Sequence, residues 1–191
     1  MRSAIALAST FVALLLSCAP RPEASLIPAD YSTWKKTTDL ILNYPIPGHE
    51  NRLRIPRMNS IGFDSLPAPG SSPSKWNFAT GTIIAKEVYA SPTPSAGEGP
   101  VQVTAMIKAP GDPRARSSWI WVAKDLSTGK ERVFTENFCV TCHANANEKH
   151  PYADKNPEGE FRDYVFIVPE SALPKPSSAE DEEKEYGDKA K

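Results

Sequence analysis

Nineteen prolines among 191 residues argue against a helical bundle as the architecture of this chain. This is about twice the average proline usage of roughly 5%. A proline inside a helix removes a backbone hydrogen bond and clashes with the preceding turn, so it costs that helix about 3 kcal/mol. The composition therefore favours strands joined by proline-rich loops. A chain of 191 residues is long enough for one domain with its own core.

The N-terminus predicts export from the cytoplasm. Arg2 precedes an apolar run from Ala4 to Leu16, which is shorter than the roughly 20 residues that a bilayer span requires. Residues 1–17 are therefore predicted to be a secretory signal peptide. The sequence Leu15-Leu16-Ser17-Cys18 resembles a bacterial lipobox, in which the cysteine carries lipid. Because Leu16 is bulkier than the usual residue there, an ordinary secretory cut nearby is the alternative.

Lipid on Cys18 would anchor the protein to the periplasmic side of a bacterial membrane. Residues 18–28 contain three prolines among mostly small residues and are predicted to be a tether between membrane and domain. The tail, residues 170–191, is rich in charge and serine and is expected to be disordered. The net charge of −1 gives no reason to expect nucleic acid as a partner.

A C-x-x-C-H motif lies late in the chain, from Cys139 through Cys142 to His143. Two thiols at this spacing lie on one side of a helical turn and match the two vinyl groups of a haem. The adjacent histidine can then bind the iron as proximal ligand. We therefore expect one covalently bound haem c, with Cys139, Cys142 and His143 as its binding residues and His143 as the metal ligand.

Three other interpretations of the motif stay open. A redox-active C-x-x-C usually lies in a thioredoxin-like βαβ setting, which the sequence does not suggest. A zinc site needs more cysteines or histidines than the chain offers beside His49 and His150. A disulfide between Cys139 and Cys142 is possible but geometrically awkward.

The sequence does not determine the ligand on the opposite side of the iron. The candidates are His49, His150, Met58 and Met106, and each of them is more often a packing or surface residue. No methionine follows the motif, whereas small class I cytochromes c carry their methionine ligand far downstream of it. This order argues against an ordinary electron-carrying cytochrome c.

Hydrophobic periodicity predicts a mainly β domain of the α+β class over residues 29–169. The expected fold is a curved antiparallel sheet with an N-terminal helix and a C-terminal haem-binding helical turn. Asp30 is expected to cap the helix, whose apolar pattern reaches Leu42 and which Pro45 ends. Strands are expected at residues 51–58, 80–89, 101–108, 118–124 and 163–168, the first at an edge because it contains Pro56.

The order of these pieces resembles the cytochrome P-460 family, which includes the cytochromes c′-beta. The likeness rests on the Tyr31/Trp34 segment, the strands 81–87 and 104–108, the late motif, and Asp163-Tyr164-Val165-Phe166. It covers roughly residues 29–169. It implies a mainly β fold, frequent dimerisation and a five-coordinate haem with an open distal side.

The resemblance also assigns two residues a catalytic role. In the hydroxylamine-oxidising branch a strand lysine is covalently joined to the porphyrin edge, and the matching residue is Lys86. The family's distal carboxylate matches Thr104, which is a poor general base at neutral pH. Glu87 is predicted to lie on the opposite face of its strand and is an unlikely substitute.

Three functions follow from these expectations. The first is oxidation of hydroxylamine, with or without nitric oxide as a ligand, which needs a periplasmic electron-transfer protein as partner. The second is binding of nitric oxide without turnover, and the third is electron transfer through a six-coordinate haem. Acid/base residues near the iron would favour the first function, an apolar distal lining the second and a strong axial ligand the third.

Overall fold

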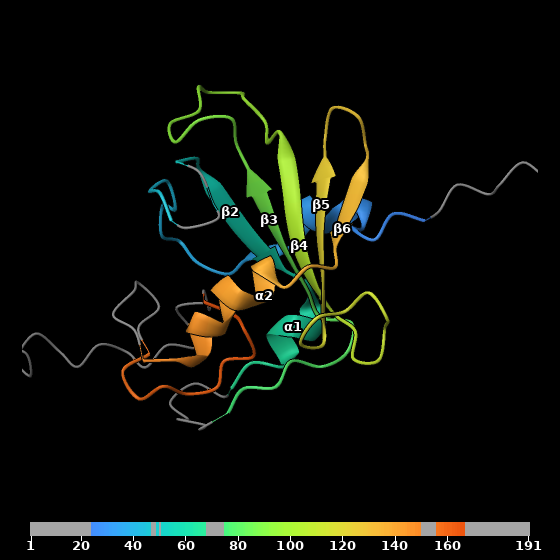
Figure 1. The fold of residues 1–191 in the computed structure, drawn as a ribbon. Coiled ribbons are helices and arrows are strands. Elements are labelled where there is room, and N and C mark those ends of the chain that lie inside the picture. The colour runs from blue at the N-terminus through green and yellow to red at the C-terminus, as the bar shows by residue number, and fades with distance from the viewer. Residues whose placement is uncertain (1–23, 47–48, 50, 68–74, 150–155, 167–191) are drawn as a thin grey trace, which may run out of the picture.

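The computed structural model describes residues 24–46, 49, 51–67, 75–149 and 156–166. Within these residues the chain forms a six-stranded antiparallel sheet whose strands follow one another in sequence order (Figure 1). The strands are β1 (Lys35–Lys36), β2 (Arg54–Met58), β3 (Ile83–Val88), β4 (Gln102–Lys108), β5 (Trp119–Asp125) and β6 (Glu131–Phe134). The helices are η1 (Ala29–Thr33), α1 (Ser60–Asp64), α2 (Phe138–His143) and η2 (Ala144–Asn147). This confirms the predicted α+β, mainly β class.

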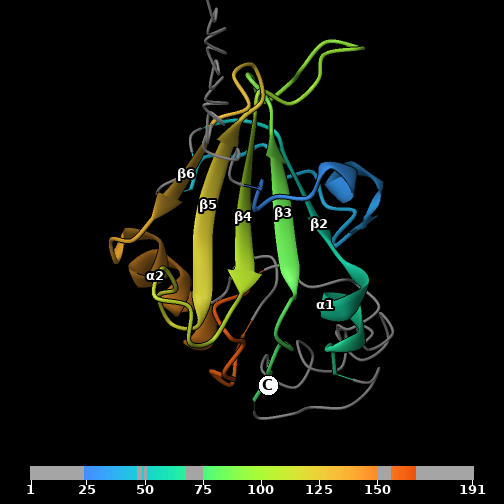
Figure 2. The same ribbon diagram turned by 90° about the vertical axis from the view of Figure 1, so that its right-hand side faces the viewer.

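Both faces of the sheet are covered. Figure 2 shows α2 on one side of the sheet and η1 on the other. We call the two sides the α2 face, which includes Ile84, Met106 and Trp121, and the N-terminal face, which includes Ala85, Val103, Ala105 and Val122. Successive strand residues alternate between these faces, as β geometry requires. The alternation predicted along residues 80–89 and 101–108 is therefore confirmed.

The N-terminal segment covers its face of the sheet. Ile27 is only 1% exposed and packs against the cluster of Ala85, Val103, Ala105 and Val122. Burying a side chain of this size stabilises the fold by about 1.5–3 kcal/mol. Leu26 and Ile27 also donate backbone hydrogen bonds to Glu131 at 2.8 and 3.3 Å. The last residues of the expected tether therefore belong to the folded domain, whereas residues 1–23 lie outside the described part.

The predicted helix from Asp30 to Leu42 is wrong. Only the 3-10 helix η1 forms, and Trp34 after it is extended, with φ −70° and ψ 153°. Lys35 and Lys36 pair with β2 instead, and the side chain of Ile41 is 72% exposed. Within residues 37–42 the polar Thr37 and Thr38 and the apolar Leu42 are buried, whereas Leu40 and Ile41 are exposed, so burial does not follow the apolar face of a helix. The backbone of this segment instead hydrogen-bonds to β2, from Thr37 N to the Pro56 carbonyl and from Arg54 N to the Leu42 carbonyl. Asp30 is not the cap, since the N-cap residue is Pro28.

The expected edge position of the strand that contains Pro56 is wrong, because β2 lies between β1 and β3, but Pro56 itself lies beside the end of the two-residue edge strand β1. Its carbonyl accepts a hydrogen bond from Thr37 N at 3.0 Å, on the side of the two-residue strand β1. In an antiparallel ladder the N–H and C=O of one residue point to the same side. The donor that proline lacks would therefore point toward this short edge strand and not toward β3.

The predicted strand at residues 163–168 is also wrong in its described part. Asp163 and Tyr164 have φ values of 51° and 70°, which a strand does not allow. The turn that they form has a role in the site below. Residues 167–168 and the charged tail, 170–191, lie outside the described residues. Among the described residues, no helix has the length and hydrophobicity that a membrane crossing needs.

Candidate haem-binding site

The helix α2 carries the motif on the α2 face of the sheet. Cys139 and Cys142 are both free thiols and both half-buried. Residues three apart lie on one side of a helix, so the two thiols share a side of α2. Burial raises the pKa of the Cys139 thiol. A redox-active C-x-x-C needs the opposite shift, because its attacking sulfur is a thiolate.

His143 ends α2 with its ring held in a defined orientation. Its Nδ1 donates a hydrogen bond to the carbonyl oxygen of Tyr164 at 2.9 Å. The ring also packs against Trp121 and Phe166, at centroid distances of 4.8 and 5.5 Å. Burial lowers the pKa of His143 to about 4, and the charge of Lys86 acts in the same direction. The imidazole is therefore neutral at pH 7, with Nε2 carrying the lone pair that a metal needs.

Lys86 lies on the same face and contacts His49. Its Nζ is 3.2 Å from His49 Nδ1 and 3.0 Å from His49 Nε2. Burial, and then the charge of Arg54, lower the pKa of Lys86 to about 7, while Cys139 opposes the shift. Burial, Lys86, His143 and Arg54 together lower the pKa of His49 to about 3. Both imidazoles are thus neutral at pH 7.

Thr104 lies next to Lys86, on the neighbouring strand and on the same face of the sheet. The two residues are register partners on β4 and β3, and Ala123 follows Thr104 in the same row on β5. Cross-strand partners share one face, so the structure brings Thr104 and Lys86 together. Glu87 lies on the N-terminal face, 3.3 Å from Arg57. The predicted position of Glu87, on the face opposite Lys86, is therefore confirmed.

The two methionines considered as iron ligands are core residues. Met58 is 1% exposed and Met106 is 8% exposed, and both belong to the cluster of the α2 face. The absence of a side chain at Gly62 leaves the space that the Met58 thioether fills. His150, the other histidine considered, lies outside the described residues.

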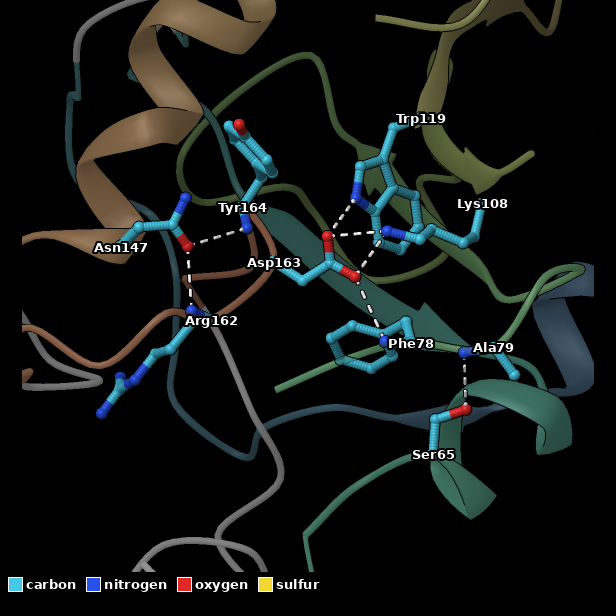
Figure 3. Close-up of polar contacts among 9 residues, drawn as sticks. All are labelled: Ser65, Phe78, Ala79, Lys108, Trp119, Asn147, Arg162, Asp163 and Tyr164. Carbon is cyan, nitrogen blue, oxygen red and sulfur yellow. Dashed lines mark hydrogen bonds and ion pairs between the residues drawn. The ribbon is translucent and has the colours of Figure 1, made fainter. Parts of the chain in front are cut away.

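A buried carboxylate supports the turn that holds His143. Figure 3 shows Asp163 between Lys108, Trp119 and Phe78. Lys108 Nζ lies 2.7 Å from both carboxylate oxygens, Trp119 Nε1 donates at 3.2 Å, and the Phe78 amide donates at 3.1 Å. All four carboxylate contacts come from segments far from Asp163 in the sequence. The turn is therefore fixed to the sheet and not only to its neighbours.

Asn147 holds the same turn from the other side. Its Oδ1 accepts hydrogen bonds from the amides of Arg162 at 2.9 Å and Tyr164 at 3.2 Å (Figure 3). A bulky residue in the left-handed region costs of order 1–3 kcal/mol, so Tyr164 needs such support. The result is that the Tyr164 carbonyl faces His143 Nδ1. Sequence reasoning missed this arrangement, because a carbonyl acceptor leaves no signal in a residue pattern.

The alternative of a zinc site receives no support. Among the residues that the structure describes, no three His, Cys, Asp or Glu side chains form a group that could hold a metal ion. No family model matches the sequence, and no curated protein matches it. The arrangement of two free thiols, one oriented imidazole and a buried amine is the basis of the function proposed next.

Proposed function

We propose that this chain is an exported c-type haem protein, similar to cytochrome P-460, that binds hydroxylamine or nitric oxide at its iron. The observation that carries the proposal is the hydrogen bond from His143 Nδ1 to the Tyr164 carbonyl, on the same helix as two free thiols. Histidines that bind metals usually donate their other ring N–H to such an acceptor, which fixes the tautomer and the ring orientation. The residues present therefore fit a covalently attached haem.

Three residues would hold the group. Cys139 and Cys142 would form the thioether bonds, and His143 would bind the iron through Nε2. The haem would supply an iron that binds small nitrogenous molecules and exchanges single electrons. The chain contributes the surroundings, namely the aromatic rings of Trp121 and Phe166 against His143 and the polar groups of Lys86 and Thr104.

Lys86 and Thr104 favour binding over fast oxidation. The Lys86 amine and the Thr104 hydroxyl can both hydrogen-bond a small bound molecule. Neither is a carboxylate, and a hydroxyl is a weak base at pH 7. Hydroxylamine oxidation, if it occurs, is therefore slow and passes its electrons to a periplasmic electron-transfer protein. Dimerisation and lipid on Cys18 are parts of the same proposal.

The first test is the mass of the protein produced with its haem-attachment machinery. We expect the intact mass to exceed that of the mature polypeptide by one haem. Cys139→Ser with Cys142→Ser should abolish attachment, whereas Thr141→Ser, inside the motif but without a role in attachment, should keep it. A wild-type chain that carries only a Cys139–Cys142 disulfide would overturn the proposal.

A second test addresses Lys86. A bond from its amine to a porphyrin carbon removes one hydrogen from each atom, and the two electrons pass to an oxidant such as a peroxide. A crosslinked holoprotein should therefore be lighter by two hydrogen atoms and show a red-shifted ferrous band. Lys86→Ala should restore an ordinary c-haem spectrum. If the spectrum of Lys86→Ala equals that of the wild type, no crosslink forms, and binding of nitric oxide without turnover becomes the better assignment.

A further inference from the structure

His49 lies across from His143, although the two are 94 positions apart in the sequence. The ring centroids are 6.5 Å apart and the ring planes cross at 81°. The two rings belong to different segments, one leading into β2 and the other at the end of α2. Since His49 is half-buried and also contacts Lys86 on the sheet, its ring points toward the site and not into solvent.

The fold holds His49 in this place through Arg54. The guanidinium of Arg54 is buried and donates from Nε to the Leu42 carbonyl at 3.3 Å and from Nη2 to the Tyr44 carbonyl. Two residues further along, Ile46 and His49 form an antiparallel bridge, with hydrogen bonds of 2.9 and 3.3 Å. The segment that carries His49 is therefore fastened to β2.

The separation of the two rings matches a shared metal. Imidazole–metal bonds of about 2 Å place the ring centres of two ligands on opposite sides of one metal roughly 6 Å apart. His143 already commits Nδ1 to Tyr164 and keeps Nε2 for a metal. On the His49 side, the Lys86 amine lies 3.2 Å from Nδ1 and 3.0 Å from Nε2. If one of these nitrogens bound a metal, the amine would keep its contact with the other nitrogen alone, in the way that ligating histidines are usually oriented.

We propose that His49 is the second axial ligand of the haem iron, so that hydroxylamine or nitric oxide binds only by displacing it. This inference rests on the proposed function, since it requires the haem. It replaces the open distal side that the family resemblance implies. Met58 and Met106 are unsuited to the role, because both side chains fill the core of the α2 face.

The spin state of the ferric holoprotein tests this assignment. Two imidazoles give a low-spin iron, so we expect low-spin absorption and electron paramagnetic resonance spectra for the wild type. His49→Ala should become high-spin, and added imidazole should restore the low-spin spectra. The affinity for cyanide should rise at least tenfold in His49→Ala, because no internal ligand has to be displaced. Met106→Leu is the matched control and should stay low-spin.

The outcomes separate this inference from the proposed function. A chain without haem overturns both. A wild-type holoprotein that carries haem but is high-spin overturns the assignment of His49 alone, and this result needs no variant to fold. Low-spin spectra that persist in His49→Ala without imidazole also overturn it, since another residue would then be the ligand.

Discussion

Thr104 is the register partner of Lys86 on the neighbouring strand. In the proposed likeness to cytochrome P-460 it takes the place of the distal carboxylate of the hydroxylamine-oxidising branch. A well-placed general base contributes about 10²–10⁴ to a rate. We expect Thr104→Glu to raise hydroxylamine oxidation by at least about tenfold, less than the full effect because the surroundings have not adapted to the new carboxylate. The measurement is hydroxylamine-dependent reduction of an acceptor dye by the holoprotein. Thr104→Gln, of similar size but without basicity, is the control, and an equal rise in that variant would refute the explanation.

Some residues of the candidate site could be predicted from the sequence, and others could be found only from the fold. Cys139, Cys142 and His143 follow from a local motif, so no knowledge of the fold is needed to find them. His49 was one of four candidate ligands, and only the fold shows which of these lies opposite His143. The Tyr164 carbonyl could not be found at all, because its direction depends on φ angles that other segments stabilise.

Among the elements, the turn at Asp163 makes the strongest prediction about stability. Asp163→Asn removes the charge that balances Lys108 inside the core. Breaking a buried ion pair by removing one partner costs about 3–5 kcal/mol. We expect a loss of this size in the free energy of unfolding measured with urea. In the proposed holoprotein the reduction potential of the haem should shift as well, because the Tyr164 carbonyl would then hold His143 less firmly.

A matched control for Asp163→Asn is Asp112→Asn. Asp112 also pairs with a cation, Arg114, at 2.9 Å, but this pair lies in a loop and is only half-buried. Its removal should change the free energy of unfolding little, because water replaces the lost partner. An equal loss of unfolding free energy in the two variants would show that burial of Asp163 does not increase its contribution to stability.

The elements also show where sequence patterns reach their limit. The strands β3, β4 and β5 were predicted because each alternates between two covered faces, so local pattern and tertiary burial agree. Residues 34–42, after η1, have apolar side chains at helical spacing. Their backbone nevertheless pairs with the edge of the sheet, and Leu40 and Ile41 are exposed. The short strand β6 was missed because its four residues, Glu131–Phe134, carry too little pattern.

At the scale of the whole molecule, Glu131 joins the N-terminal segment to the sheet. Burial alone would raise the pKa of the Glu131 carboxyl, but hydrogen bonds from Ser25, Leu26 and Ile27, together with Lys124, lower it below the ordinary value of 4.5. A carboxylate whose pKa is lowered by folding stabilises the folded state at pH values above its ordinary, unfolded-state pKa. This contribution is lost as the pH falls through the folded-state pKa. Glu131→Gln should therefore be less stable than the wild type at pH 7.

The difference between Glu131→Gln and the wild type should shrink as the pH falls below about 4.5, because the protonated carboxyl resembles the amide. Urea unfolding at several pH values measures it. Asp39→Asn, at an exposed position before β2, is the control and should show no such trend. A difference that is constant from pH 7 to pH 3 would mean that the charge of Glu131 does not hold the segment.

The contact between the N-terminal segment and Glu131 also determines how far the domain could lie from a membrane if Cys18 carried a lipid. Ser25 is hydrogen-bonded to Glu131 and lies seven positions after Cys18. A fully extended stretch of this length spans at most about 25 Å, so an anchored domain would remain within that distance of the bilayer surface. We expect the wild type in the membrane fraction of cells that export it, and Cys18→Ser in the soluble periplasmic fraction with its haem still attached. Ser17→Ala keeps the cysteine and a small residue before it, so it should remain membrane-bound. A wild type found in the soluble fraction would show that Cys18 carries no lipid and that the signal peptide is removed by an ordinary secretory cut.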